Sequence, residues 1–415
     1  MELTVAELFA GVGGFRVGLN YINKIDSDGK AIENGDWKFV WANQFEPSTK
    51  SQEAFDCYVK RFGKENHSNV DINLVDKKEI PNHSLLVGGF PCQDYSVART
   101  LANEKGIQGK KGVLFWDIKD TLAEKNPPFV LLENVDRLLN SPSTQRGRDF
   151  AIMLKTLDYL GYDVQWRVIN AGDYSMPQKR RRVFIFAYKK TLNFAKKIKK
   201  ESLNFSKDSI FNAEFKVEDE FDFKEVDLNE YEDILNVSDK YNSGKFLQSG
   251  LMIDGEVISS DIKSIPEEKY TLGKILQISK PYNKSPEKYA LQDEKLKKFR
   301  YLKGSKRIER VSKSGHSYIY SEGSMSFPEN LNEPARTMLT SEGTVNRSTH
   351  VVYDESIKQN RLITPIEAEL IQMFPINWTD TMSDRKRYFM MGNALVTGII
   401  SRLEPTLKNI ISNEK

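Results

Sequence analysis

Cysteine is scarce in this 415-residue sequence, where Cys57 and Cys92 are the only two. Two cysteines are too few for a disulfide framework or a cysteine-rich zinc site, so no metal is expected and each cysteine is interpreted alone. Long apolar runs are also absent, and the first residues lack the basic and then apolar pattern of a signal peptide. No membrane association is therefore expected, and the cytoplasm is the predicted location.

A strong net charge is absent as well. The formal net charge is +3, which does not by itself indicate a nucleic-acid partner. Any such indication must come from local clusters of basic residues. The hydrophobic fraction of 39% and the 23 Phe residues supply packed cores, which excludes global disorder. A chain of this length exceeds the usual size of a single core and predicts two domains.

Short apolar segments alternate with helical patterns between residues 3 and 188. Strands are predicted at Leu3–Phe9, Phe39–Asn43, Leu85–Val87, Phe129–Leu132, Val164–Ile169 and Val183–Tyr188. Helices are predicted at Phe15–Tyr21 and at Arg148–Leu160, where apolar residues share one face and Gly161 follows. This order predicts a doubly wound α/β domain with a mostly parallel sheet, whose ligands lie beyond the carboxyl ends of the strands.

The composition changes after Tyr188, where a basic run at 189–200 precedes an acidic and aromatic stretch at 214–233. The α/β pattern returns near Arg361, with a helix predicted at Pro365–Met373 and a second one starting near Asn393. We therefore predict a first domain part at 1–190, an inserted smaller module at 191–356 and a returning part at 357–415.

Two glycine-containing turns follow predicted strands. Gly11, Gly13 and Gly14 follow the first strand, where bare backbone would let a nucleotide-like ligand approach, although an ordinary tight turn is an equal alternative. The segment Gly88-Gly89-Phe90-Pro91-Cys92 follows the strand Leu85–Val87, and its turn favours exposure of Cys92 as a candidate nucleophile. Cys57, within the helical pattern Ala54–Phe62, is interpreted as a small buried hydrophobic residue.

Two charged clusters also lie at strand ends. Glu133 closes the apolar run Phe129–Leu132 and could act as a general acid, or it could cap the next helix or pair with Arg137. Arg180, Arg181 and Arg182 lead into an apolar strand, so Arg180 and Arg182 share one face. A solvated charge run is the ordinary alternative for these arginines.

In this order the four clusters resemble the motif set of the bacterial C5-cytosine-specific DNA methyltransferases of restriction-modification systems. The similarity covers residues 4–188 and 361–402, and its most specific elements are Phe90-Pro91-Cys92-Gln93, Glu133-Asn134-Val135 and Gln178-Lys179-Arg180. The resemblance implies an S-adenosyl-L-methionine-dependent methyltransferase fold, an inserted target-recognition domain, double-stranded DNA as substrate and a companion restriction endonuclease. A monomer is favoured. An RNA cytosine methyltransferase and a catalytically inactive DNA-binding relative are the alternatives.

The resemblance also implies roles for individual residues. The catalytic residues would be Cys92, Glu133, Arg180 and Arg182, with Cys92 adding to carbon 6, Glu133 protonating ring nitrogen 3, Arg182 contacting the ring oxygen and Arg180 bracing the loops or the base. The cofactor residues would be Phe9, Gly11, Gly13, Gly14, Gln44, Phe45, Asp71, Ile72, Pro91, Leu114, Asn393 and Ala394. Gln44 falls where the family usually carries an acid for the ribose, and the sequence leaves open whether Gln44 or Glu46 takes that role.

Candidate DNA contacts come from two regions. Gln93 and Ser96 begin a segment, Ser96–Gly112, that resembles the loop closing over DNA in this family, although it could be an ordinary surface loop. In the predicted inserted module, basic residues occur together with Phe299 and Tyr301, which predicts a phosphate-binding surface. The candidates there are Lys297, Lys298, Arg300, Lys306, Arg307, Arg336 and Arg347, of which the last two could contact base edges.

Overall fold

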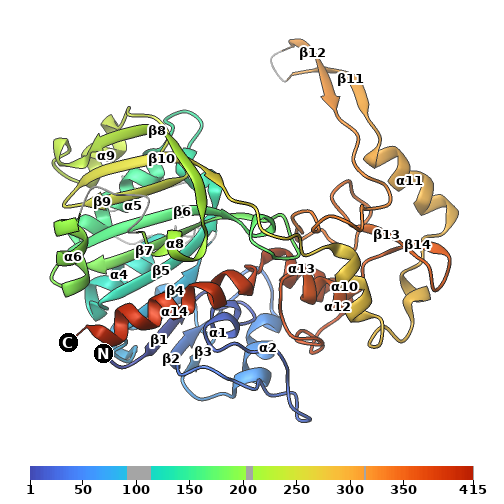
Figure 1. The fold of residues 1–415 in the computed structure, drawn as a ribbon, viewed down its shortest axis with the longest axis horizontal. Coiled ribbons are helices and arrows are strands. Elements are labelled where there is room, and N and C mark those ends of the chain that lie inside the picture. The colour runs from blue at the N-terminus through green and yellow to red at the C-terminus, as the bar shows by residue number, and fades with distance from the viewer. Residues whose placement is uncertain (91–113, 202–208, 313–314, 415) are drawn as a thin grey trace.

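The computed structural model describes residues 1–90, 114–201, 209–312 and 315–414, and its centre is a ten-stranded sheet (Figure 1). The strand order is β3-β2-β1-β4-β5-β7-β6-β9-β10-β8. These strands are β1 (Thr4–Leu8), β2 (Lys38–Asn43), β3 (His67–Ser68), β4 (Leu85–Gly89), β5 (Phe129–Val135), β6 (Tyr162–Asn170), β7 (Arg181–Lys189), β8 (Val217–Asp227), β9 (Ser249–Ile253) and β10 (Glu256–Ser264). Each strand predicted from the sequence is therefore present.

The half of the sheet from β3 to β5 is parallel, as predicted. The chain places β2 on one side of β1 and β4 on the other, so the strand order reverses between β1 and β4. Doubly wound sheets bind their ligands at such a switch point, beyond the carboxyl ends of the strands. The glycine turn after β1 and the residues after β4 both lie there.

The other half of the sheet is antiparallel. Strand β7 runs antiparallel to both β5 and β6, and β9 continues the sheet from β6 toward β10 and β8. Strands β8, β9 and β10, which come from residues 217–264, extend the large sheet beyond β6. The domain division at 191 and 356 stays a prediction.

Helices cover both faces of the sheet because alternate strand residues point to opposite sides. Ala6 and Leu8 pack on the face covered by α4 (Phe115–Lys125), α5 (Arg148–Tyr159) and α9 (Ile234–Lys240). Val5 and Val87 pack on the face covered by α1 (Gly14–Leu19), α6 (Asn193–Glu201), α8 (Ile210–Glu214) and α14 (Thr397–Asn413). The predicted doubly wound architecture is confirmed.

A third core lies beside the sheet and joins α2 (Glu53–Phe62) to α10 (Leu272–Ser279), α12 (Pro365–Ile371) and α13 (Asp384–Asn393). The helix predicted to begin near Asn393 is wrong in its start, because α13 ends at that residue and α14 begins at Thr397.

Apart from one hairpin, the remaining elements are α11 (Asp293–Lys303), β13 (Val351–Asp354), β14 (Gln359–Leu362) and the short helices η1 (Ile72–Leu74), η2 (Lys77–Glu79), η3 (Asp136–Asn140), η4 (Ala171–Asp173), η5 (Leu228–Glu230) and η6 (Pro286–Tyr289).

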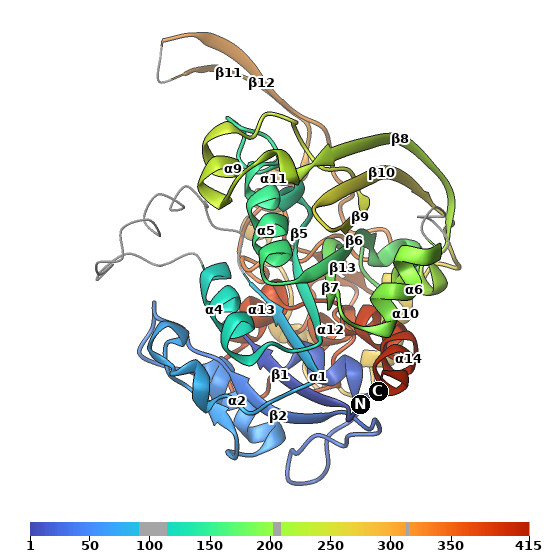
Figure 2. The same cartoon turned by 90° about the vertical axis from the view of Figure 1, so that its left-hand side faces the viewer.

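One hairpin, formed by β11 (Lys306–Val311) and β12 (Ser317–Glu322), stands apart from the rest of the molecule. Both views show it projecting beyond the body (Figures 1 and 2), and its two strands pair only with each other among the described residues. We call these two strands, Lys306–Val311 and Ser317–Glu322, the arm. Across the described residues, no helix combines the length and the apolar character that spanning a membrane requires.

Candidate active site

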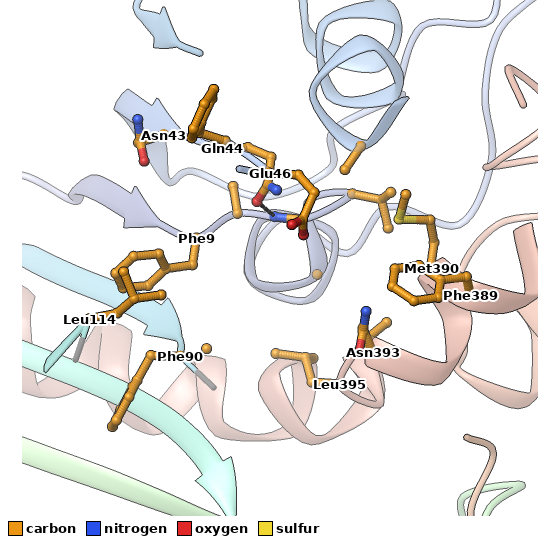
Figure 3. A pocket seen from close by; sticks show the side chains of 18 of the residues that line it. Phe9, Asn43, Gln44, Glu46, Phe90, Leu114, Phe389, Met390, Asn393 and Leu395 are labelled. Atoms are coloured by element: carbon orange, nitrogen blue, oxygen red, sulfur yellow. Dashed lines mark hydrogen bonds between the residues drawn. The ribbon is translucent and has the colours of Figure 1, made fainter. Parts of the chain in front are cut away.

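A cavity of about 1410 Å³ opens at the switch point between β1 and β4 (Figure 3). Most of the residues that the sequence predicted for cofactor and catalysis line it together. They are Phe9, Gly11, Gly14, Gln44, Phe45, Asp71, Ile72, Leu114, Glu133, Arg180, Arg182, Asn393 and Ala394. The fold thus brings together one end of the sheet, η1 and the end of α13 around a single space.

The glycine turn after β1 has the backbone of a ligand-binding loop. Gly11 has φ of 56°, and a Cβ added there would meet nothing within 4 Å, so its bare backbone faces open space. Gly13 has φ of 88° and does not line the cavity; a Cβ there would lie 2.7 Å from the Phe62 ring. Gly11 therefore leaves room for a ligand, whereas Gly13 permits close packing of the turn against α2.

The segment after β2 supports this turn. The side-chain Oε1 of Gln44 accepts a hydrogen bond from the backbone N–H of Gly11 at 2.7 Å. Phe45 and Glu46 line the same cavity, and Figure 3 shows Glu46 there. Gln44 thereby fixes the glycine turn relative to the end of β2.

Two further sides of the cavity come from distant parts of the chain. Asp71 accepts a hydrogen bond from the Asn73 N–H at 3.1 Å and so caps η1, in which Ile72 is buried. Leu114 lies directly before α4, while Asn393 and Ala394 end α13. Apolar walls and a few fixed polar groups are typical of a small-molecule site.

Glu133 lies at the end of β5, buried and facing Arg182. The Oε1 atom of Glu133 lies 3.0 Å from Nε of Arg182, so its ion pair is with Arg182 and not with Arg137. Burial raises the pKa of Glu133 above its ordinary value, while the charges of Arg182 and Arg180 oppose this rise. A carboxyl with a raised pKa beside a cavity is a candidate general acid.

The backbone after β4 is held close to this carboxyl. Asn134 donates from Nδ2 to the carbonyl oxygen of Phe90 at 2.9 Å. A Cβ at Gly89 would lie 3.2 Å from Oε2 of Glu133, so a larger residue there would crowd the carboxylate. The residues that follow Phe90, including Pro91, Cys92, Gln93, Ser96 and the rest of Ser96–Gly112, lie outside the described residues.

The arginines of the fourth cluster separate as strand geometry requires. Arg180 and Arg182 both line the cavity, whereas Arg181 lies 3.1 Å from Asp136 at the surface. Arg180 is buried and donates to the carbonyl oxygens of Met338 and Gly392, each at 2.9 Å. Burial lowers the pKa of Arg180 to about 9. Arg180 thus connects the start of β7 to the end of α13.

The predicted DNA contacts fall into two groups. Lys297, Lys298 and Arg300 lie exposed on α11, and Lys306 and Arg307 begin the arm. Arg336 instead pairs with Glu329 at 2.7 Å, and Arg347 pairs with Glu322 at 2.7 Å. Lys297, Lys298, Arg300 and Arg307 are therefore exposed to a ligand, although Lys298 also pairs with Glu294 at 2.6 Å. Lys306, which lies 3.2 Å from Glu322, is occupied by contacts within the chain, as are Arg336 and Arg347.

Sequence reasoning missed one wall of the cavity. Arg385, Lys386, Phe389 and Met390 of α13 line it, and Lys386 pairs with Glu53 of α2 at 2.6 Å. The signal available was Ser383 followed by Asp384, a typical helix start, which would have placed α13 before Asn393. Cys57 is buried in α2 and its Sγ donates to the Trp378 carbonyl oxygen at 3.3 Å, which confirms its interpretation as a core residue.

Comparisons with known proteins agree with this geometry. The model of the C-5 cytosine-specific DNA methylase family matches residues 3–409. The type II methyltransferase M.Sau3AI of Staphylococcus aureus is 48% identical over 416 residues, covering 99% of this chain and 97% of that protein. The type II methyltransferase M1.ScrFI of Lactococcus lactis is 25% identical over 409 residues, covering 99% and 79%. The S. pombe Dnmt2 methyltransferase structure, with a TM-score of 0.57 and 16% identity, covers 98% of this chain and 99% of its own and supports the fold alone.

Proposed function

Because the chain belongs to the C-5 cytosine-specific DNA methylase family, we infer that it is a type II DNA (cytosine-5-)-methyltransferase that modifies a cytosine of a specific sequence. The observation that carries this proposal is the Glu133–Arg182 pair, which lines the same cavity as the glycine turn at the sheet's switch point. A general acid for the target cytosine and a loop for a nucleotide-like cofactor thus line the same cavity.

The cofactor in this proposal is S-adenosyl-L-methionine, which supplies an electrophilic methyl group on a sulfonium. The residues present fit such a group: Gly11 leaves open space where a side chain would stand, and Phe9, Phe45 and Leu114 offer apolar surface. The cavity of about 1410 Å³ exceeds the roughly 300–1,000 Å³ typical of one small ligand. It therefore has room for a cofactor and a flipped base together.

Carbon 5 of cytosine is too poor a nucleophile to take a methyl group unaided. We assign its activation to Cys92, whose sulfur lone pair forms a bond to carbon 6 while the electrons of the C5–C6 double bond move onto carbon 5 and ring nitrogen 3. Glu133 donates a proton to nitrogen 3, and Arg182 contacts the ring oxygen. After methylation, a base accepts the carbon 5 proton, the proton on nitrogen 3 returns to Glu133, the C5–C6 double bond re-forms and sulfur leaves as the thiolate.

This chemistry requires the target base to leave the double helix, at a cost of a few kcal/mol. Contacts to double-stranded DNA must offset that cost. The exposed lysines and arginines of α11 and the arm supply positive charge on one part of the molecule. We assign phosphate contacts to Lys297, Lys298, Arg300, Lys306 and Arg307, and a companion restriction endonuclease would cleave the same sequence when it is unmethylated.

The test is expression of the wild-type chain and of Cys92→Ser in a bacterial host that lacks cytosine methylation. Bisulfite sequencing of the host DNA should show one cytosine protected at every copy of a short sequence with the wild type, and none with Cys92→Ser. Calorimetry on both purified proteins should show the same affinity for S-adenosyl-L-methionine. Unprotected DNA in cells whose wild-type chain, once purified, is folded and binds S-adenosyl-L-methionine would refute the proposal.

A further inference from the structure

Gln44 occupies the position at which the family usually carries the acid for the cofactor ribose, but its amide oxygen is already used. Oε1 of Gln44 accepts the hydrogen bond from the Gly11 N–H at 2.7 Å. What remains of the side chain is an uncharged NH₂ donor, whereas the hydroxyls of a ribose are best held by a carboxylate that accepts from them. Gln44 is therefore built to hold the glycine turn.

Glu46 brings a carboxylate to the same cavity two residues later (Figure 3). Its Oε1 accepts hydrogen bonds from the Ser48 N–H at 3.1 Å and from the Ser48 hydroxyl. Among the residues that the structure describes, none donates to its Oε2. One oxygen thus orients the side chain, and the other is available to a ligand.

The backbone around Glu46 is fixed by neighbouring amide side chains. Oε1 of Gln52 accepts from the Glu46 N–H at 2.9 Å, and Nε2 of Gln52 donates to the Glu46 carbonyl oxygen at 2.9 Å. Asn69 donates to the Gln44 carbonyl oxygen at 2.6 Å and to Oε1 of Gln52 at 3.1 Å. A carboxylate held in this way loses little conformational freedom on binding.

We propose that Glu46 accepts hydrogen bonds from the ribose hydroxyls of S-adenosyl-L-methionine, and that Gln44 acts as a positioning residue for the glycine turn. The proposal rests on the proposed function, since it needs that cofactor. It assigns to this chain a ribose contact two residues beyond the position that the family usually uses. The pairing of an amide at 44 with a carboxylate at 46 keeps one negative charge in the segment.

The test measures the binding of two ligands by calorimetry: S-adenosylhomocysteine and its 2′,3′-dideoxyribose analogue. The wild type should bind the analogue about 10- to 100-fold more weakly, the range for lost hydrogen bonds to a charged group. In Glu46→Gln this penalty, the ratio of the two affinities, should fall to about threefold or less. The variant loses affinity for S-adenosylhomocysteine but not for the dideoxyribose analogue. Gln44→Ala should weaken both ligands equally and keep the penalty.

Glu53→Gln is the matched control, because Glu53 is another carboxylate of this cavity and its partner is Lys386. It should keep the full penalty. A wild-type penalty retained in Glu46→Gln, or lost in Gln44→Ala alone, overturns the assignment while leaving the proposed function intact. If the wild type binds neither ligand, the cofactor itself is wrong and the inference falls with it. Near-ultraviolet circular dichroism verifies the fold of each variant, and Glu46→Asp gives a second variant that retains the charge.

Discussion

The Nε atom of Arg182 lies 3.0 Å from Oε1 of Glu133, across the junction between β7 and β5. Burial raises the pKa of Glu133, and the Arg182 charge works against that rise. A cytosine that takes over the contact with Arg182 would weaken the effect by which the Arg182 charge lowers the pKa of Glu133. The pKa of Glu133 would then rise, so Glu133 would hold its proton more firmly as the substrate binds. The pair thus couples occupation of the cavity to the state of the acid.

Replacing Arg182 should move the pH dependence of the reaction. A general acid works only while protonated, so kcat/KM should fall as pH rises through the pKa of Glu133. Arg182→Gln removes a charge that lowers this pKa, so the descending limb should shift to higher pH, while the rate itself drops. Arg181→Gln, which alters only the surface pair with Asp136, should leave the limb in place. An unmoved limb in Arg182→Gln would exclude Glu133 as the titrating acid.

Strand ends were the most predictable part of this molecule. Apolar runs such as Phe129–Leu132 marked buried strands, and parallel strands deliver their final residues to one edge. Glu133 and the glycine turn could therefore be expected at the same edge from the pattern of residues alone. The alternation of Arg180 and Arg182 followed from the twofold period of a strand.

Contacts between residues far apart in the sequence were much less predictable. The sequence shows that Arg336 and Arg347 are charged but not that Glu329 and Glu322 neutralise them, since these contacts depend on how loops pack. Strand β9 joins the sheet through β6, which lies about 80 residues earlier in the chain, and no local pattern reports such a pairing. The α13 wall was missed because its residues form no motif.

Arg180 should matter for stability as well as for catalysis. Arg180→Met removes the donors to two buried carbonyl groups, those of Met338 and Gly392. Each unsatisfied group costs about 1–3 kcal/mol, so the free energy of unfolding should fall by about 2–6 kcal/mol in urea titrations followed by tryptophan fluorescence. Arg181→Met should cost less than about 1 kcal/mol, because its ion pair is half exposed. Equal losses in the two variants would contradict the bracing role.

The two cysteines should differ completely in reactivity. Burial raises the pKa of Cys57 to about 12, so its thiol stays protonated and inert at neutral pH. Oligonucleotides carrying 5-fluorocytosine at the target position, with cofactor present, should become covalently trapped on the wild type and on Cys57→Ala. They should not be trapped on Cys92→Ser. Trapping that survives in Cys92→Ser would assign the nucleophile to another residue.

The arm should contribute to DNA affinity through charge. An isolated two-stranded hairpin is marginally stable in water, and this one exposes Arg307 together with Arg310, whose guanidinium lies 3.8 Å from the centre of the Tyr320 ring. A two-stranded ribbon fits the major groove, so both arginines are placed to contact duplex DNA. The double variant Arg307→Ala, Arg310→Ala should reduce the magnitude of the negative slope of log K against log salt by about 2, as measured by fluorescence anisotropy. Lys263→Ala, which removes a positive charge from β10 in the large sheet, should leave the slope unchanged. A slope that stays the same in the arm variant would place the DNA elsewhere on the molecule.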